Sequence, residues 1–139
     1  MHLFTNPEVK KVFDAYPKEA GQNLLRFRDF IFEVAADFEP AISLEEALRW
    51  SEPAYLCKTG STIRLACKKD KPAEFAMYFN CKTQLIETIQ EVFGTEFQYE
   101  GNRALIFQVG QSVNTLALKQ CIALALRYHK LKHLPLLGL

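Results

Sequence analysis

The sequence predicts an α+β fold in which a five-stranded, mainly antiparallel sheet is packed by N-terminal and C-terminal helices. Apolar residues at helical spacing occupy both ends of the chain, whereas the middle shows the period of two that half-buried strands produce. The alternating strand–helix rhythm of a parallel sheet is missing. With 139 residues, 49% of them apolar and 24% charged, the chain matches one globular domain spanning residues 1–139.

Two helices are predicted at the N-terminus. Asn6 precedes Pro7, and such a pair caps and starts a helix, which then ends before Pro17. From Lys18, apolar residues recur every three or four positions until Pro40. This spacing is typical of a long amphipathic helix that buries one stripe.

A third, short helix is predicted before the first strand. Ser43 stands three residues before Glu46, which is the spacing of a capping box, where a hydroxyl and a carboxylate satisfy the free amides of a helix start. The run S-L-E-E-A-L-R-W leads to Pro53, which cannot continue a helix. We therefore expect this helix to end near Trp50.

Five strands are predicted beyond Pro53. Apolar residues alternate in residues 63–67 and 75–79, and polar turns before and between these runs indicate an antiparallel meander of three strands. A helix over about 83–93, closed by Gly94, precedes a second hairpin that turns at residues 100–102. That hairpin supplies the last two strands.

A C-terminal helix is predicted from near Asn114 to about His133, and its apolar stripe indicates that it lies against the sheet. The tail after it, L-K-H-L-P-L-L-G-L, is unusually apolar for a chain end. Two interpretations stay open. The tail either packs back on the domain or forms a homodimer or partner contact.

Charge and composition limit the function classes. The formal net charge is +1, so no large field attracts nucleic acid, and no run reaches the roughly 18 apolar residues of a membrane span. No leader is apparent, and the four cysteines form no C-x-x-C pair, so they fit small core residues in a reducing cytosol. No catalytic or cofactor motif occurs, and we expect a cytoplasmic protein that is not an enzyme.

Two groups of residues have the spacing of metal ligands. Asp29, Glu33 and Asp37 lie four apart on the predicted second helix, where their carboxylates would form a row for a hard cation such as iron, or simply the solvated face. His129 and His133 are also four apart. The glutamate of a zinc-protease helix is missing between them, and cationic side chains are favoured near a helix C-terminus in any case.

A third candidate site lies at the predicted step from helix to sheet. Trp50, Pro53 and Tyr55 stand there, where apolar pockets for a ligand or a partner often open. The alternative is that Trp50 fills the core and that Pro53 only breaks the helix.

One segment resembles a known family. The run E-E-A-L-R-W-S-E-P-A-Y at 45–55, followed by a strand hairpin and a late F-x-Y-x-x-x-x-x-L-x-F stretch, resembles the YdhG-like family of small bacterial domains of unknown function (domain-of-unknown-function family 1801). One branch is described as frataxin-like, which implies an α-β-α sandwich and an intracellular iron chaperone. The acidic ridge of frataxins does not carry over, because Glu8 and Asp14 stand beside Lys10 and Lys11.

These observations predict a small cytosolic binding domain, with iron as the ligand that the resemblance suggests. The alternative is a protein-interaction module or a homodimer that uses no metal.

Overall fold

The two N-terminal helices form where the sequence predicts them. In a computed structural model of residues 1–139, α1 spans Pro7–Ala15 and α2 spans Lys18–Asp37. The side-chain oxygen of Asn6 accepts hydrogen bonds from the backbone N–H groups of Glu8 and Val9, as an N-cap does. Both helix predictions are confirmed.

The sheet is open, antiparallel throughout, and has six strands rather than the predicted five. Its order is β1-β2-β3-β4-β6-β5. The strands are β1 (Glu45–Arg49), β2 (Glu52–Leu56), β3 (Ile63–Lys68), β4 (Lys71–Tyr78), β5 (Gln98–Glu100) and β6 (Ala104–Gln108). The α+β class and the β2-β3-β4 meander agree with the sequence analysis.

The extra strand replaces the predicted third helix, so the capping-box interpretation of Ser43 and Glu46 is wrong. β1 pairs with β2 up to Arg49 opposite Glu52, and Trp50 and Ser51 form the two-residue turn between them. Both turn residues have positive φ, 56° and 62°. Tertiary pairing has overridden a strong local helix propensity here.

The remaining helices follow the predicted order with one break. They are α3 (Leu85–Phe93), α4 (Thr115–Leu126) and α5 (Tyr128–Leu131), with short 3₁₀ turns η1 (Gly94–Glu96) and η2 (Pro135–Gly138). The predicted continuous C-terminal helix is wrong at Arg127, where α4 ends. No helix of the chain is both long enough and apolar enough to cross a membrane.

The break has a physical cause in the loop between β2 and β3. The Thr59 hydroxyl donates to the Leu126 carbonyl at 2.7 Å, and the Ser61 N–H donates to the Ala125 carbonyl at 2.9 Å. These bonds take carbonyls that a continuing helix would use for its next turn. The loop therefore ends α4.

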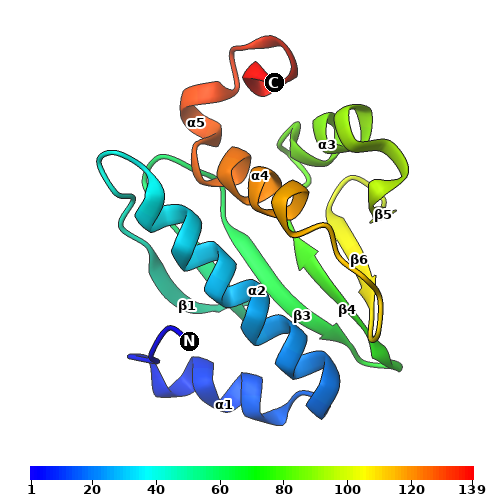
Figure 1. Cartoon of the computed structure of the whole chain (residues 1–139). Coiled ribbons are helices and arrows are strands. Elements are labelled where there is room, and N and C mark those ends of the chain that lie inside the picture. The colour runs from blue at the N-terminus through cyan, green and yellow to red at the C-terminus, as the bar shows by residue number, and fades with distance from the viewer.

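The helices cover one face of the sheet, and the main core lies between them (Figure 1). The Phe27 ring of α2 packs against Phe75 of β4 at 5.6 Å and against Phe107 of β6 at 4.8 Å, measured between ring centroids. The ion pairs Arg64–Glu52 and Lys68–Glu100 are formed by strand residues that alternate with the core residues. Their side chains therefore point to the opposite face of the sheet. One face is thus packed and the other carries paired charges.

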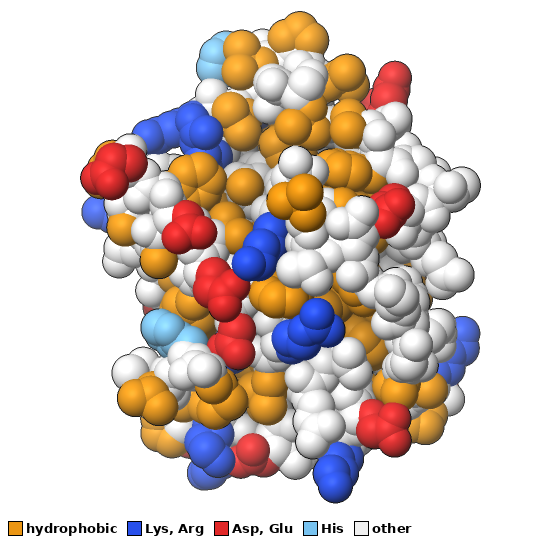
Figure 2. Space-filling view, viewed as in Figure 1, with side chains coloured by type: hydrophobic (Ala, Val, Ile, Leu, Met, Phe, Trp, Pro, Cys, Tyr) orange, Lys and Arg blue, Asp and Glu red, His pale blue; other side chains and the backbone are white.

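The C-terminal tail packs back on the domain through Leu137, which is only 1% exposed and belongs to the core. Leu134, Leu136 and Leu139 stay partly exposed. Figure 2 shows apolar side chains gathered at the top of the view, over this C-terminal segment. Packing is therefore present, and an apolar surface remains beside it.

Candidate functional site

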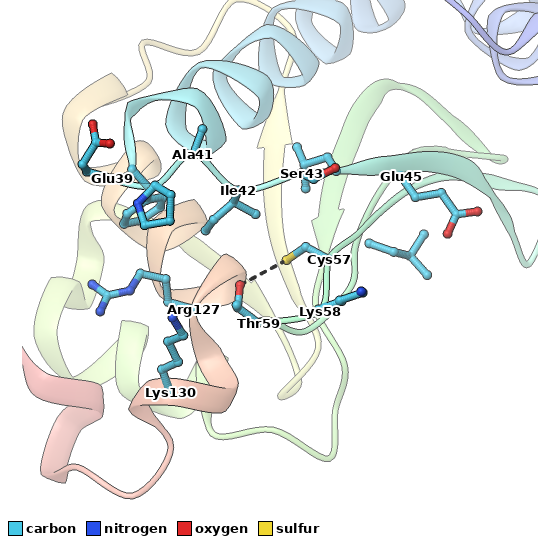
Figure 3. A pocket seen from close by; sticks show the side chains of 14 residues that line it. Glu39, Ala41, Ile42, Ser43, Glu45, Cys57, Lys58, Thr59, Arg127 and Lys130 are labelled. Atoms are coloured by element: carbon cyan, nitrogen blue, oxygen red, sulfur yellow. Dashed lines mark hydrogen bonds between the residues drawn. The ribbon is translucent and has the colours of Figure 1, made fainter.

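A groove of about 750 Å³ opens where the end of α2, the start of the β1–β2 hairpin and the α4–α5 junction meet (Figure 3). Three separate segments line it: residues 38–45, residues 56–59, and the pair Arg127 and Lys130. Its volume falls in the range of about 300–1,000 Å³ that small-molecule sites occupy.

The wall between sheet and helix is held by polar contacts at the end of α4. The Cys57 thiol donates to the Leu126 carbonyl at 3.4 Å and lies 3.8 Å from the Thr59 hydroxyl. Gly60 permits the contact, because a Cβ there would lie 2.3 Å from the Ala125 carbonyl oxygen. These contacts fix the 56–59 segment against the helix.

The floor of the groove is apolar. Its partly buried side chains, which come from the loop after α2, from the end of β2 and from the residue after it, are Phe38, Ile42, Leu44, Leu56 and Cys57. The Ile42 N–H donates to the Ala35 carbonyl at 2.9 Å, which ties the loop to α2. An apolar floor with a few polar groups around it is the usual composition of a ligand site.

Three cations stand around this floor without carboxylate partners. Lys58, Arg127 and Lys130 take part in none of the chain's seven salt bridges. The Arg127 guanidinium carbon lies 5.4 Å from the centroid of the Phe38 ring. Glu39 and Glu45 also line the groove, and Figure 3 shows their carboxylates pointing away from its centre.

A buried ion pair anchors the neighbouring strand β1. Arg28 of α2 is fully buried and bonds both carboxylate oxygens of Glu46, with Nη2 to Oε1 at 3.0 Å. The Tyr55 hydroxyl donates to the same carboxylate at 2.7 Å, and burial followed by this negative charge raises the Tyr55 pKa. Because Glu45 lines the groove next to Glu46, this network positions one wall of the groove.

Trp50, Pro53 and Tyr55 do not come together in a pocket. Trp50 is 85% exposed at the tip of the β1–β2 hairpin, whereas Pro53 and Tyr55 are buried. The interpretation of Trp50 as a core residue is therefore wrong. The aromatic core residue of this segment is Tyr55.

The carboxylates of α2 do not converge on a common point. Asp29 accepts a hydrogen bond from the His2 N–H at 2.9 Å, and Glu33 pairs with Lys119 at 2.9 Å. Asp37 lies exposed at the helix end. No group of three or more His, Cys, Asp or Glu side chains has the arrangement of a metal site.

The two histidines do not form part of a metal site either. His129 is exposed on α5, and His133 follows the end of that helix, so they do not share one regular helical face. All four cysteines are free, and burial raises the pKa of Cys67 to about 11 and of Cys121 to about 12. Neither of these two thiols is a thiolate at neutral pH.

The sequence analysis missed the groove entirely. Its lining residues come from three distant segments, and none of them forms a local motif. Arg127 and Lys130 are close together in the sequence, but cations near a helix C-terminus are common and do not by themselves indicate a site. No protein-family model, curated protein or solved structure matches the chain, so the YdhG-like resemblance stays a prediction.

Proposed function

We propose that the protein is a non-enzymatic binding domain that holds a small molecule in the groove described above. The observation that carries this proposal is the pair Arg127 and Lys130, which stands without acidic partners beside a half-buried apolar floor. Such a combination of apolar area and a few placed charges favours ligand binding. The free cysteines are compatible with a reducing compartment, and we propose a cytosolic location.

The test is a fragment titration followed by backbone amide chemical shifts. Ligands should shift amides of residues 38–45, 56–59 and 127–130 together. A Ser43→Trp variant serves as the blocked control, because Ser43 lines the groove, is exposed and makes no side-chain hydrogen bond in the structure. Shifts that map elsewhere, or that persist in the blocked variant, would contradict the proposal.

A protein-interaction module is the second candidate, and Trp50 favours it. A bulky residue at positive φ costs about 1–2 kcal/mol, which the pairing of β1 with β2 offsets. The ring itself is 85% exposed, so burial within the chain does not account for a tryptophan at this turn. Strained backbone of this kind clusters at functional positions. Sedimentation velocity of the wild type and of Trp50→Ala should show a concentration-dependent dimer that only the wild type forms.

The C-terminal surface offers a second route to a homodimer. Leu136 is 43% exposed beside the buried Leu137. A Leu136→Ser variant should lose the dimer while keeping its melting temperature, because Leu136 is not a core residue. If Leu136→Ser and Trp50→Ala sediment like a monomeric wild type, the interaction hypothesis has no support from self-association.

Iron binding, which the family resemblance implies, has weaker support than the groove. Asp29 and Glu33 are both engaged, and a stable iron site needs several converging ligands. Anaerobic ferrous titration by calorimetry tests it, with Asp29→Asn, Glu33→Gln and Asp37→Asn combined as the control. Micromolar binding that this variant loses would restore the iron hypothesis, whereas the groove proposal expects no stoichiometric heat.

A further inference from the structure

We propose that the ligand of the groove is an anionic amphiphile, meaning a carboxylate or phosphate head on an apolar body. The head would lie at Arg127 and Lys130, and the body would lie along the floor towards β1 and β2. This inference rests on the proposed function and specifies the chemistry of that same site.

The first argument is the placement of charge. The chain forms seven salt bridges, and none of them involves Lys58, Arg127 or Lys130, although Glu39 and Glu45 line the same groove. Arg127 is half-buried and lies over the Phe38 ring at 5.4 Å, which limits its orientations. A guanidinium held in this way binds a planar oxyanion with two hydrogen bonds at a small entropy cost.

The second argument is the polarity along the groove. Figure 3 shows Arg127 and Lys130 at the helical end, whereas Ile42 lies towards the sheet. Leu56 stands opposite Glu45 in the strand register, so the far end is formed by β1 and β2. The sheet end also carries the exposed side chains of Lys58 and Glu45, whose charges are opposite. A ligand with an anionic head at the helical end and an apolar body along the floor matches this arrangement.

The third argument concerns the negative end of α4, which would otherwise repel an anion. The carbonyl groups at a helix C-terminus carry a partial negative charge. Here the Leu126 carbonyl accepts from the Thr59 hydroxyl and from the Cys57 thiol, so its lone pairs are occupied on the side of the groove. The carboxylates of Glu39 and Glu45 point outward (Figure 3), and neither forms an ion pair with Arg127 or Lys130.

Cys57 supplies a direct readout because it lines the groove and is half-buried. In a Cys81→Ser background the exposed thiol is removed, and alkylation at Cys57 is followed by mass spectrometry of its peptide. Four ligands with one apolar chain are compared: decanoate, decyl phosphate, decanol and decyltrimethylammonium, each below its micelle concentration. Decanoate and decyl phosphate should slow alkylation at Cys57. The ratio of the two alkylation rates shows whether the groove prefers a carboxylate or a phosphate head.

Variants then separate charge from general apolar binding. Arg127→Gln and Lys130→Gln should each weaken protection by the anions about tenfold, as expected for loss of one charged hydrogen bond, and leave decanol unchanged. Lys132→Gln is the matched control, because it removes the same charge from an exposed position outside the groove. Added salt should weaken the protection of Cys57 by the two anions and leave the protection by decanol unchanged.

The outcomes distinguish the two proposals. Protection by the anions that depends on Arg127 and Lys130 supports both. Equal protection by decanol and by the cationic amphiphile, unaffected by these variants, overturns the anionic inference and leaves the groove as a binding site. If no amphiphile protects Cys57 and the fragment titration is also silent, both proposals fail. Melting curves of each variant confirm that the fold is intact.

Discussion

Replacing Glu46 by Gln should destabilise the protein more than any other conservative change of a charged residue. Arg28 is 0% exposed and keeps its charge, so the variant leaves a buried guanidinium whose hydrogen-bond partners are all neutral: the His2 and Leu3 carbonyls and the new amide oxygen. Removing one member of a buried pair costs about 3–5 kcal/mol. We expect the lower end, about 3 kcal/mol, because Gln retains one acceptor oxygen for Arg28.

The assay is thermal and urea unfolding followed by far-UV circular dichroism. For a chain of 139 residues, each kcal/mol moves the melting midpoint by about 3 °C, so Glu46→Gln should lower it by roughly 10 °C. Glu45→Gln is the control: it is the exposed neighbour, makes no ion pair, and should change stability by less than about 0.5 kcal/mol. A Glu46→Gln midpoint within 2 °C of the wild type, at about 3 °C per kcal/mol, would refute the argument that this pair anchors β1.

Three further changes test other contacts. Gly60→Ala should cost about 1–3 kcal/mol in urea unfolding, because its Cβ would meet the Ala125 carbonyl oxygen at 2.3 Å; a neutral result would mean that the loop is free to move away. Trp50→Ala should leave stability within about 0.5 kcal/mol, and the wild-type emission spectrum should be that of a solvated indole. The hydrogen bond from Lys68 lowers the pKa of Glu100, so its stabilisation is complete above the ordinary carboxyl pKa and is lost as pH falls through the lowered value. The stability difference between wild type and Glu100→Gln should therefore shrink below about pH 4, and a constant difference would exclude this ion pair as its source.

Elements that are specified locally could be predicted from sequence. Asn6 and Pro7 begin α1 because a side-chain oxygen and a fixed φ act within one turn of the helix. Strands β3 and β4 follow from alternation, since Leu65 and Met77 are fully buried, whereas Arg64, which precedes Leu65, and Tyr78, which follows Met77, are half-buried. In both cases the signal and the structure lie within the same few residues.

Strand β1 could not be predicted in that way, because its inward residue is a glutamate. The run S-L-E-E-A-L-R-W consists mostly of helix formers, and its period of two disappears if Glu46 is counted as a surface residue. Only the position of Arg28, 18 residues earlier on α2, makes a buried carboxylate favourable. The turn was hidden as well, since Trp50 and Ser51 stand where Asn-Gly is the common signal.

The groove combines both kinds of information, which is why it appears only in three dimensions. Its sheet wall depends on the pairing of Glu46 with Arg28, and its helical wall depends on the bonds from the 57–61 loop to the end of α4. The second set of bonds also ends α4 just before Arg127, so the interaction that breaks the helix also places the cation at the groove. A continuous helix through Arg127 would direct this side chain according to the helical repeat alone. The charge of the groove is therefore a consequence of the loop docking, and substitutions in the loop should change ligand selectivity along with stability.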